Sequence, residues 1–215
     1  MLKIKICGIR TEEAAEAASS NGAAFIGFIF FDRSRRYIAP TDAARISKKF
    51  PSIKKVGVFV DERSDVVNSI ADRVGLDYVQ LHGSETSEYA ATIERPIIKA
   101  WRFGDNFDVQ SANEFPCEIV LLDSFVKGQA GGTGQLFNWT AAAMLTARLT
   151  KPLLIAGGIS IENVSTAVAM FKPFGVDVSG SLEIDGVKSV DLIKKFLMAV
   201  RENEATKIGT SDDGL

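Results

Sequence analysis

The sequence predicts an α/β fold, a single (β/α)₈ TIM barrel with a parallel eight-stranded sheet. The chain has 215 residues, 46% of them hydrophobic, which is enough to bury a sizeable core in one domain. Short aliphatic runs alternate with amphipathic stretches along almost its whole length, the pattern of a parallel sheet. Eight such runs favour a closed barrel over an open doubly wound sheet, which more often has about five to seven strands.

The expected strands are continuously apolar rather than alternating. This suits a sheet covered by helices on its outer face and filled by side chains inside. The strands are predicted at Ile4–Cys7, Ala24–Phe30, Lys55–Val60, Tyr78–Leu81, Ile97–Ala100, Ile119–Leu122, Leu153–Ala156 and Val176–Ser179.

Helices are predicted between the strands. Thr11 precedes two glutamates like an N-cap, and Pro40 opens the second helix. A short or irregular helix is expected within Asp105–Phe115, where Asn, Gly and Asp break the period. The other helices are predicted at Glu12–Ser20, Thr41–Phe50, Ser64–Val74, Ser87–Ile93, Trp139–Leu149, Ile161–Met170 and Val187–Asn203.

No Pro, Gly or Ser-rich linker divides the chain. We expect a barrel domain over residues 1–202 and a polar, disordered tail over 203–215, because the tail lacks apolar spacing. Met1-Leu2-Lys3 leads straight into a strand, without a basic leader or a run of about 18 apolar residues. These features predict a cytoplasmic protein that is not inserted in a membrane.

Charge and cysteine content exclude several classes of partner. Lys and Arg total 25 against 27 Asp and Glu, a net charge of −2, which gives no positive field for nucleic acid or an anionic membrane. Two cysteines and one histidine are too few for a disulfide framework or a self-sufficient Cys/His zinc site. A small-molecule partner is favoured, and no metal or cofactor is expected.

Reactive residues that follow strands are the candidates for catalysis, because barrel sites form where strands end. Cys7 closes the first strand before Gly8, and Asp123 follows the sixth. A thiol and a carboxyl without metal ligands suit proton transfer, which suggests an isomerase. The alternatives are a buried apolar cysteine and a turn-capping aspartate. Cys117 begins the sixth strand and is assigned to packing.

Glycine-bearing segments late in the chain are typical of phosphate binding. Backbone N–H groups after the seventh and eighth barrel strands often hold phosphate, and glycine permits close approach. Any one of the segments could instead serve a tight turn. The segments are Gly131-Gly132-Thr133-Gly134, Ala156-Gly157-Gly158-Ile159 and Val178-Ser179-Gly180-Ser181.

Two further polar groups follow strands. Arg33, Arg35 and Arg36 come after the second strand, either as a solvated loop or as a guanidinium fork for a carboxylate. His82 follows Gln80 at the end of the fourth strand, where it lines the site or bonds its own loop.

Together these residues resemble the phosphoribosylanthranilate isomerase family of tryptophan biosynthesis. The resemblance spans nearly the full chain, with each segment at its own strand end. It rests on Lys5-Ile6-Cys7-Gly8-Ile9, Gly27-Phe28-Ile29-Phe30, Ser34-Arg35-Arg36-Tyr37, Val79-Gln80-Leu81-His82-Gly83, Leu122-Asp123-Ser124, Gly131-Gly132-Thr133-Gly134, Ala156-Gly157-Gly158-Ile159 and Gly175-Val176-Asp177-Val178-Ser179.

The resemblance implies a cofactor-free Amadori rearrangement of N-(5-phosphoribosyl)anthranilate to 1-(2-carboxyphenylamino)-1-deoxyribulose 5-phosphate. Asp123 matches the general acid, Cys7 the general base and Arg36 the residue that holds the anthranilate carboxylate. Cys7 must then be available as thiolate while Asp123 keeps a proton, so unusual pKa values are expected. The other expected substrate-binding residues are Gln80, His82, Gly132, Thr133, Gly134, Gly157, Gly158, Asp177, Ser179, Gly180 and Ser181.

The chain departs from the family pattern after the eighth strand. Ser179-Gly180-Ser181 transposes the last two residues of the usual Ser-Ser-Gly, which puts the affinity for phosphate in question more than the reaction. Asn138 stands where Asp is common, which should affect only helix capping.

Two alternatives stay open. The related histidine-pathway isomerase performs the same rearrangement, but that family places Asp where this chain has Cys7, and no half-chain repeat is evident. A barrel that binds a sugar phosphate without converting it is the other, since fold does not dictate function. A monomer is expected, with a dimer as the alternative.

Overall fold

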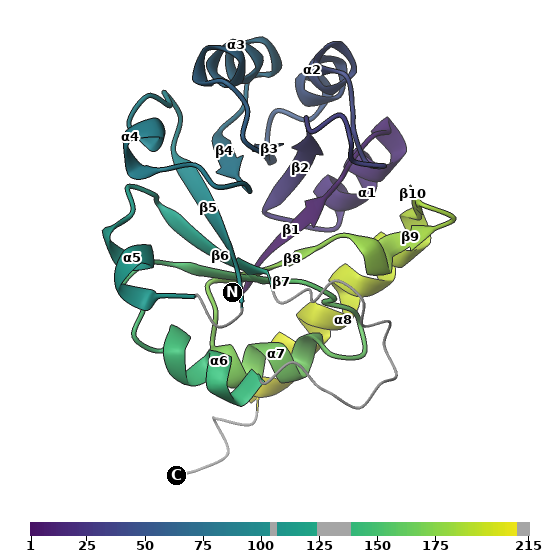
Figure 1. The fold of residues 1–215 in the computed structure, drawn as a ribbon. Helices are drawn as coiled ribbons and strands as arrows, with labels where there is room; N and C mark the ends of the chain where they lie inside the picture. Colours follow the sequence, from purple (N-terminus) through teal and green to yellow (C-terminus); the bar gives the residue numbers. More distant parts are fainter. Residues whose placement is uncertain (104–106, 124–138, 210–215) are drawn as a thin grey trace.

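The chain forms a closed barrel of eight parallel strands surrounded by helices (Figure 1). This computed structural model describes residues 1–103, 107–123 and 139–209, with the backbone alone for 203–209. The strands follow one another in sequence order around the barrel, and β8 pairs with β1 to close it. They are β1 Lys3–Cys7, β2 Phe25–Ile29, β3 Lys54–Phe59, β4 Tyr78–Leu81, β5 Ile97–Arg102, β6 Ile119–Asp123, β7 Leu153–Ala156 and β8 Gly175–Val178.

Helices follow the strands and form the outer layer seen in Figure 1. They are α1 Glu12–Ser20, α2 Pro40–Lys49, α3 Ser64–Val74, α4 Ser87–Ala90, α5 Val109–Glu114, α6 Trp139–Thr146, α7 Val164–Phe171 and α8 Val190–Gly209, with a 3₁₀ turn η1 at Gly180–Leu182 and a small hairpin of β9 Glu183–Ile184 and β10 Val187–Lys188. The Thr11 side chain caps α1 by accepting from the amide of Ala14, as predicted.

Two apolar layers follow from the alternation of side chains along each strand. Ile4 and Ile6 of β1 pack with the helices in the larger cluster, so Lys5 and Cys7 on the other strand face point into the barrel. The interior cluster contains strand residues alone, among them Phe25, Ile98, Leu121 and Leu154. This is the packed barrel core that the continuous apolar runs predicted.

The predicted (β/α)₈ architecture is confirmed, with strand ends that differ by at most two residues. The expected short fifth helix is α5, which Asp108 caps. Four helices are shorter or shifted: α2 runs one residue earlier, over Pro40–Lys49, α4 ends at Ala90, α6 ends at Thr146, and α7 begins at Val164.

The helix predicted at Val187–Asn203 was wrong at both ends. Asp185 and Gly186 both have positive φ, 50° and 77°, and form a two-residue turn that pairs Val187 with Ile184. Asp-Gly is a strong signal for this turn, since both central residues of a type I′ turn need positive φ. The helix begins after the hairpin and continues to Gly209, into the tail expected to be disordered.

Candidate active site

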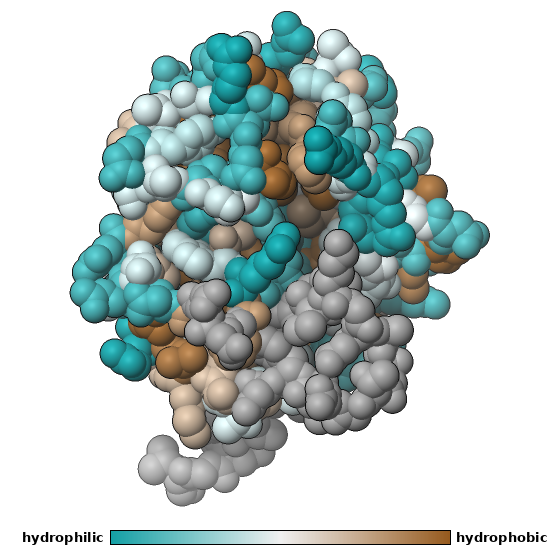
Figure 2. All heavy atoms as spheres, in the orientation of Figure 1, coloured by the Kyte–Doolittle hydropathy of each residue, from teal (hydrophilic) through white to brown (hydrophobic). Residues whose placement is uncertain are grey.

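The carboxyl ends of the strands bring most of the predicted residues together. Cys7 ends β1 and Asp123 ends β6, while His82 follows β4 and Ser179 follows β8. The Ser179 Oγ donates to the carbonyl oxygen of Cys7 at 3.0 Å, which ties β8 to β1 at this end. In the view of Figure 2, hydrophilic residues predominate over the upper half of this face, and hydrophobic residues are visible between them toward the centre.

Cys7 lies at the open end of the barrel with its thiol almost wholly buried, the residue being 6% exposed. A Cβ at Gly27 would lie 3.0 Å from its Sγ, so the glycine on β2 makes the room for sulfur. Burial raises the pKa of the Cys7 thiol above its ordinary value, although the Lys5 ammonium opposes this. The site thus favours the neutral thiol, whereas the expected base is the thiolate.

Lys5 is a residue of the site that the sequence analysis missed. It is fully buried inside the barrel, and its Nζ donates to Oδ1 of Asp177 at 2.9 Å. Desolvation lowers the pKa of Lys5, but Asp177 and Cys7 outweigh it and raise that pKa, so the side chain stays charged. Asp177, predicted to bind substrate, is placed as the partner of this lysine. The spacing in the sequence could have identified Lys5 as a site residue, because residues two apart on a strand share a face, as Lys5 and Cys7 do.

Asp123 faces the only histidine of the sequence. Its Oδ2 lies 3.5 Å from Nε2 of His82, and Nδ1 of His82 lies 2.9 Å from Nε2 of Gln80. Because an amide nitrogen can only donate, this contact leaves the proton of a neutral His82 on Nε2, facing Asp123. The predicted residues Gln80, His82 and Asp123 therefore form one polar row across the barrel mouth.

Arg36 is held by a carboxylate of this chain. Its Nε and Nη2 donate to the two oxygens of Glu183 at 2.5 and 2.9 Å, and Lys188 donates to the same group at 2.6 Å. Gly8, with φ of 82°, and Gly180 flank the guanidinium arm: a Cβ at either would lie 2.8 or 3.3 Å from it. Arg36 thus reaches the site in a fixed orientation, with its Nη1 edge outside the Glu183 pair.

Glu183 was also missed by the sequence analysis. Its side chain is 4% exposed, and although burial raises the pKa of a carboxyl, the bonds from Arg36 and Lys188 lower the pKa of Glu183 to about 2. Glu183 is 147 residues from Arg36 and 5 residues from Lys188 in the sequence. A local sequence pattern therefore could not predict the whole cluster.

Because of this cluster, we expect the free energy of unfolding to fall at acid pH. The pKa of Glu183 is depressed from 4.5 to about 2, so its stabilisation is complete above the unfolded value and is lost as pH falls toward 2. Over that window the wild type should lose about 3 kcal/mol of unfolding free energy that Glu183→Gln does not lose. Urea unfolding at a series of pH values measures this. The exposed Glu16→Gln on α1 should follow the wild type, and parallel curves for Glu183→Gln would contradict the assignment.

The loops after β7 and β8 provide the predicted glycines. Gly157 and Gly158 have φ of 83° and 73°, and a Cβ at Gly158 would meet nothing within 4 Å, so its backbone borders open space. The Ser181 Oγ donates to the carbonyl of Ile159 at 2.6 Å and ties the two loops together. Neither Gly180 nor Ser181 has positive φ, so the transposition places no serine in a strained conformation.

The predicted residues Gly132, Thr133 and Gly134 lie outside the described residues. Within residues 1–103, 107–123 and 139–209, no three His, Cys, Asp or Glu side chains are grouped to hold a metal ion, and none of the helices there is long and apolar enough to cross a membrane.

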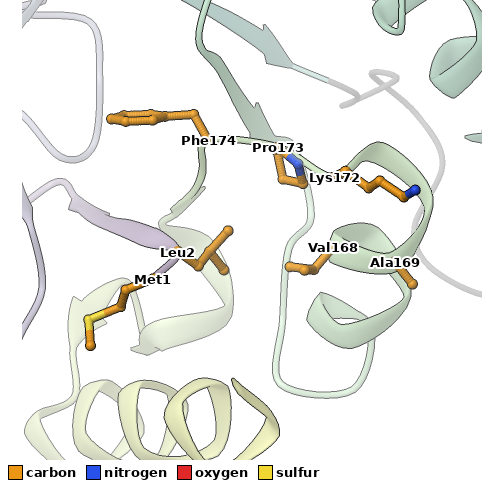
Figure 3. Close-up of a pocket in the computed structure, with 7 residues that line it drawn as sticks. All are labelled: Met1, Leu2, Val168, Ala169, Lys172, Pro173 and Phe174. Atoms are coloured by element: carbon orange, nitrogen blue, oxygen red, sulfur yellow. The ribbon is translucent and has the colours of Figure 1, made fainter. Parts of the chain in front are cut away.

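A surface pocket lies at the opposite end of the barrel (Figure 3). Met1 and Leu2 precede β1, and Pro173 and Phe174 precede β8, so the pocket sits at the amino ends of these strands. Chemistry in such barrels occurs at the carboxyl ends, and this pocket is therefore separate from the site of Cys7 and Asp123.

Comparison with known proteins agrees with this geometry. The family described as N-(5'phosphoribosyl)anthranilate (PRA) isomerase matches residues 4–199. The N-(5'-phosphoribosyl)anthranilate isomerase of Desulforamulus reducens is 42% identical over 203 residues, 94% of this chain and 96% of the relative. The crystal structure of phosphoribosyl anthranilate isomerase from Thermotoga maritima has a TM-score of 0.83 at 37% identity, covering 94% of this chain and 100% of its own.

A second solved structure holds a ligand. It is a phosphoribosyl anthranilate isomerase in complex with reduced 1-(o-carboxyphenylamino)-1-deoxyribulose 5-phosphate, with a TM-score of 0.81 at 35% identity, covering 94% of this chain and 100% of its own. Fold and comparisons together define a barrel isomerase. The chain belongs to the N-(5'-phosphoribosyl)anthranilate isomerase family.

Proposed function

We propose that the chain catalyses the Amadori rearrangement of N-(5-phosphoribosyl)anthranilate, with Asp123 as the general acid and Cys7 as the general base. The observation that carries the proposal is the placement of a carboxyl and a thiol at the carboxyl ends of β6 and β1, facing one barrel mouth. Family membership supplies the substrate and the reaction.

The steps follow from these two groups. Asp123 gives its proton to the ribose ring oxygen, and the ring opens to a Schiff base between the sugar C1 and the anthranilate nitrogen. The Cys7 thiolate then takes the proton from C2 and becomes a thiol, leaving an enolamine that tautomerises to the ketone. His82 and Gln80 line the acid side, where the Nε2 proton of His82 faces the Asp123 carboxyl.

The two ends of the substrate need separate anion sites. The free edge of the Arg36 guanidinium suits the anthranilate carboxylate, because Glu183 already fixes the other edge. Backbone N–H groups at Gly157, Gly158 and Ser179-Gly180-Ser181 suit the phosphate, as the open space at Gly158 supports. The family resemblance also assigns substrate binding to Gly132, Thr133 and Gly134.

Turnover of freshly generated N-(5-phosphoribosyl)anthranilate, followed by the loss of its fluorescence, tests the function. Cys7→Ala should lower kcat by at least about 100-fold, the typical contribution of a positioned base, and should still bind reduced 1-(o-carboxyphenylamino)-1-deoxyribulose 5-phosphate near normally. Cys117→Ala is the matched control, since that thiol lies at the other end of the barrel, before β6. A wild-type chain that binds this ligand without turnover would establish the non-catalytic binder instead.

We infer further that the enzyme works in the cytoplasm as a monomer. The low cysteine content, two in 215 residues, supports the first inference, because disulfide frameworks belong to oxidising compartments. Light scattering of the purified chain distinguishes the monomer from the dimer.

A further inference from the structure

The buried pair of Lys5 and Asp177 has no part in the reaction steps above. It lies on the interior side of the sheet, which is mostly apolar. A buried ion pair contributes little net stability, because desolvation of both charges offsets their attraction. Such a pair in a barrel core therefore points to a role other than packing.

Geometry connects the pair to Cys7. Lys5 and Cys7 lie two residues apart on the interior face of β1, and a Cβ at Gly27 would lie 3.2 Å from the Lys5 Nζ and 3.0 Å from the Cys7 Sγ. Both atoms thus lie close to one point beside Gly27, and the ammonium favours the charged form of the thiol. Asp177 pairs with Lys5 directly across the β1 and β8 ladder, which holds the long lysine side chain in the interior.

The other charged groups near Cys7 come from neighbouring elements. Lys188 on β10 acts on the thiol more weakly than Lys5 does and is itself paired with Glu183. Arg36 crosses beside Gly8, next in sequence to the cysteine, and is paired with the same carboxylate. Asp177 opposes the thiolate, but Lys5 acts on it more strongly. Lys5 is therefore the cation placed to balance a charge on this sulfur.

We propose that Lys5, anchored by Asp177, is the positioning residue that stabilises the Cys7 thiolate and so makes it available as the base. The thiolate forms by loss of the thiol proton to water, and its charge is balanced by the Lys5 ammonium. When the sulfur takes the C2 proton of the substrate, it returns to a neutral thiol and Lys5 keeps its bond to Asp177. This role rests on the proposed function of Cys7.

Thiol reactivity tests the role of Lys5 without any need for turnover. In a Cys117→Ser background, the rate of alkylation by iodoacetamide is measured against pH, and its midpoint reports the thiolate of Cys7. Lys5→Met should move the midpoint to higher pH and slow alkylation at neutral pH by about tenfold. The acid limb of kcat/KM should move in the same direction by the same amount. An unchanged midpoint in a folded Lys5→Met protein overturns the proposal.

Two further variants keep the test decisive. Lys5→Met leaves Asp177 as an unpaired buried charge, so Lys5→Met/Asp177→Leu provides a neutral interior, and its midpoint should also rise because Lys5 outweighs Asp177 at the sulfur. Lys99→Met is the matched control: it breaks another buried lysine–carboxylate pair, with Glu85, on the outer face of β5. A midpoint that rises equally in Lys99→Met would show a general loss of structure and overturn the proposal. Absence of wild-type turnover would reject the proposed function and leave this measurement intact.

Discussion

Replacement of Asp123 by asparagine should lower kcat/KM by about 100- to 10,000-fold, the usual contribution of a general acid. Asparagine keeps the shape of the side chain at the end of β6 but has no proton to give to the ribose ring oxygen. The loss of substrate fluorescence measures the rate, and binding of the reduced product analogue should be nearly retained. The control Asp72→Asn removes an exposed carboxylate on α3 and should keep wild-type turnover.

The contact between Asp123 and His82 makes His82 the alternative general acid. Its Nε2 lies 3.5 Å from Oδ2 of Asp123, so a substrate oxygen that reaches one of these groups also lies near the other. A wild-type rate in Asp123→Asn beside an inactive His82→Gln would transfer the acid role to His82. Loss of turnover in Asp123→Asn with partial activity in His82→Gln supports Asp123 as the general acid, because His82 then acts as a positioning residue that assists it.

The architecture was predictable because each strand carries its own signal. The run Leu153–Ala156 has the bounds that the apolar pattern predicts, because a strand buried on both faces is mostly apolar. Catalytic candidates followed from the same reasoning, because Cys7 and Asp123 end such runs. The dipeptide Asp185-Gly186 also predicts the turn between β9 and β10. The helix predicted from Val187 overlooked that turn.

The ion pairs of the site could not be predicted from the sequence. Asp177 stands 172 residues from Lys5, and Glu183 stands 147 from Arg36, so each pair exists only once the barrel closes. A lysine inside an apolar strand resembles an exposed residue until the curvature of the sheet encloses it. The apolar pattern of the sequence locates the ends of the strands. Which charged side chains pair depends on which strand ends lie side by side in the closed barrel, and the chemistry of this site depends on those ion pairs.

Glu85 is a third buried carboxylate, and its partners come from three segments. Its Oε1 accepts from the amide of Asp61 at 2.9 Å, and its Oε2 accepts from the amide of Gly83 at 3.0 Å and from Lys99 Nζ at 2.7 Å. Lys99 also donates to the carbonyl of Gly83 at 2.7 Å. This network fixes the loop after β4 to β5 and thereby holds His82, which precedes Gly83, at the barrel mouth.

Replacement of Glu85 by alanine should therefore lower the free energy of unfolding by about 3 to 5 kcal/mol, since it leaves the Lys99 ammonium and two amides buried without their acceptor. For a chain of this size the melting temperature should fall by about 10 °C. Thermal unfolding measures this against Glu94→Ala, an exposed glutamate before β5. Because Glu85 holds the loop rather than touching substrate, turnover well below the melting temperature should fall less than in Asp123→Asn. Equal melting of the two alanine variants would show that the loop is held by its backbone alone.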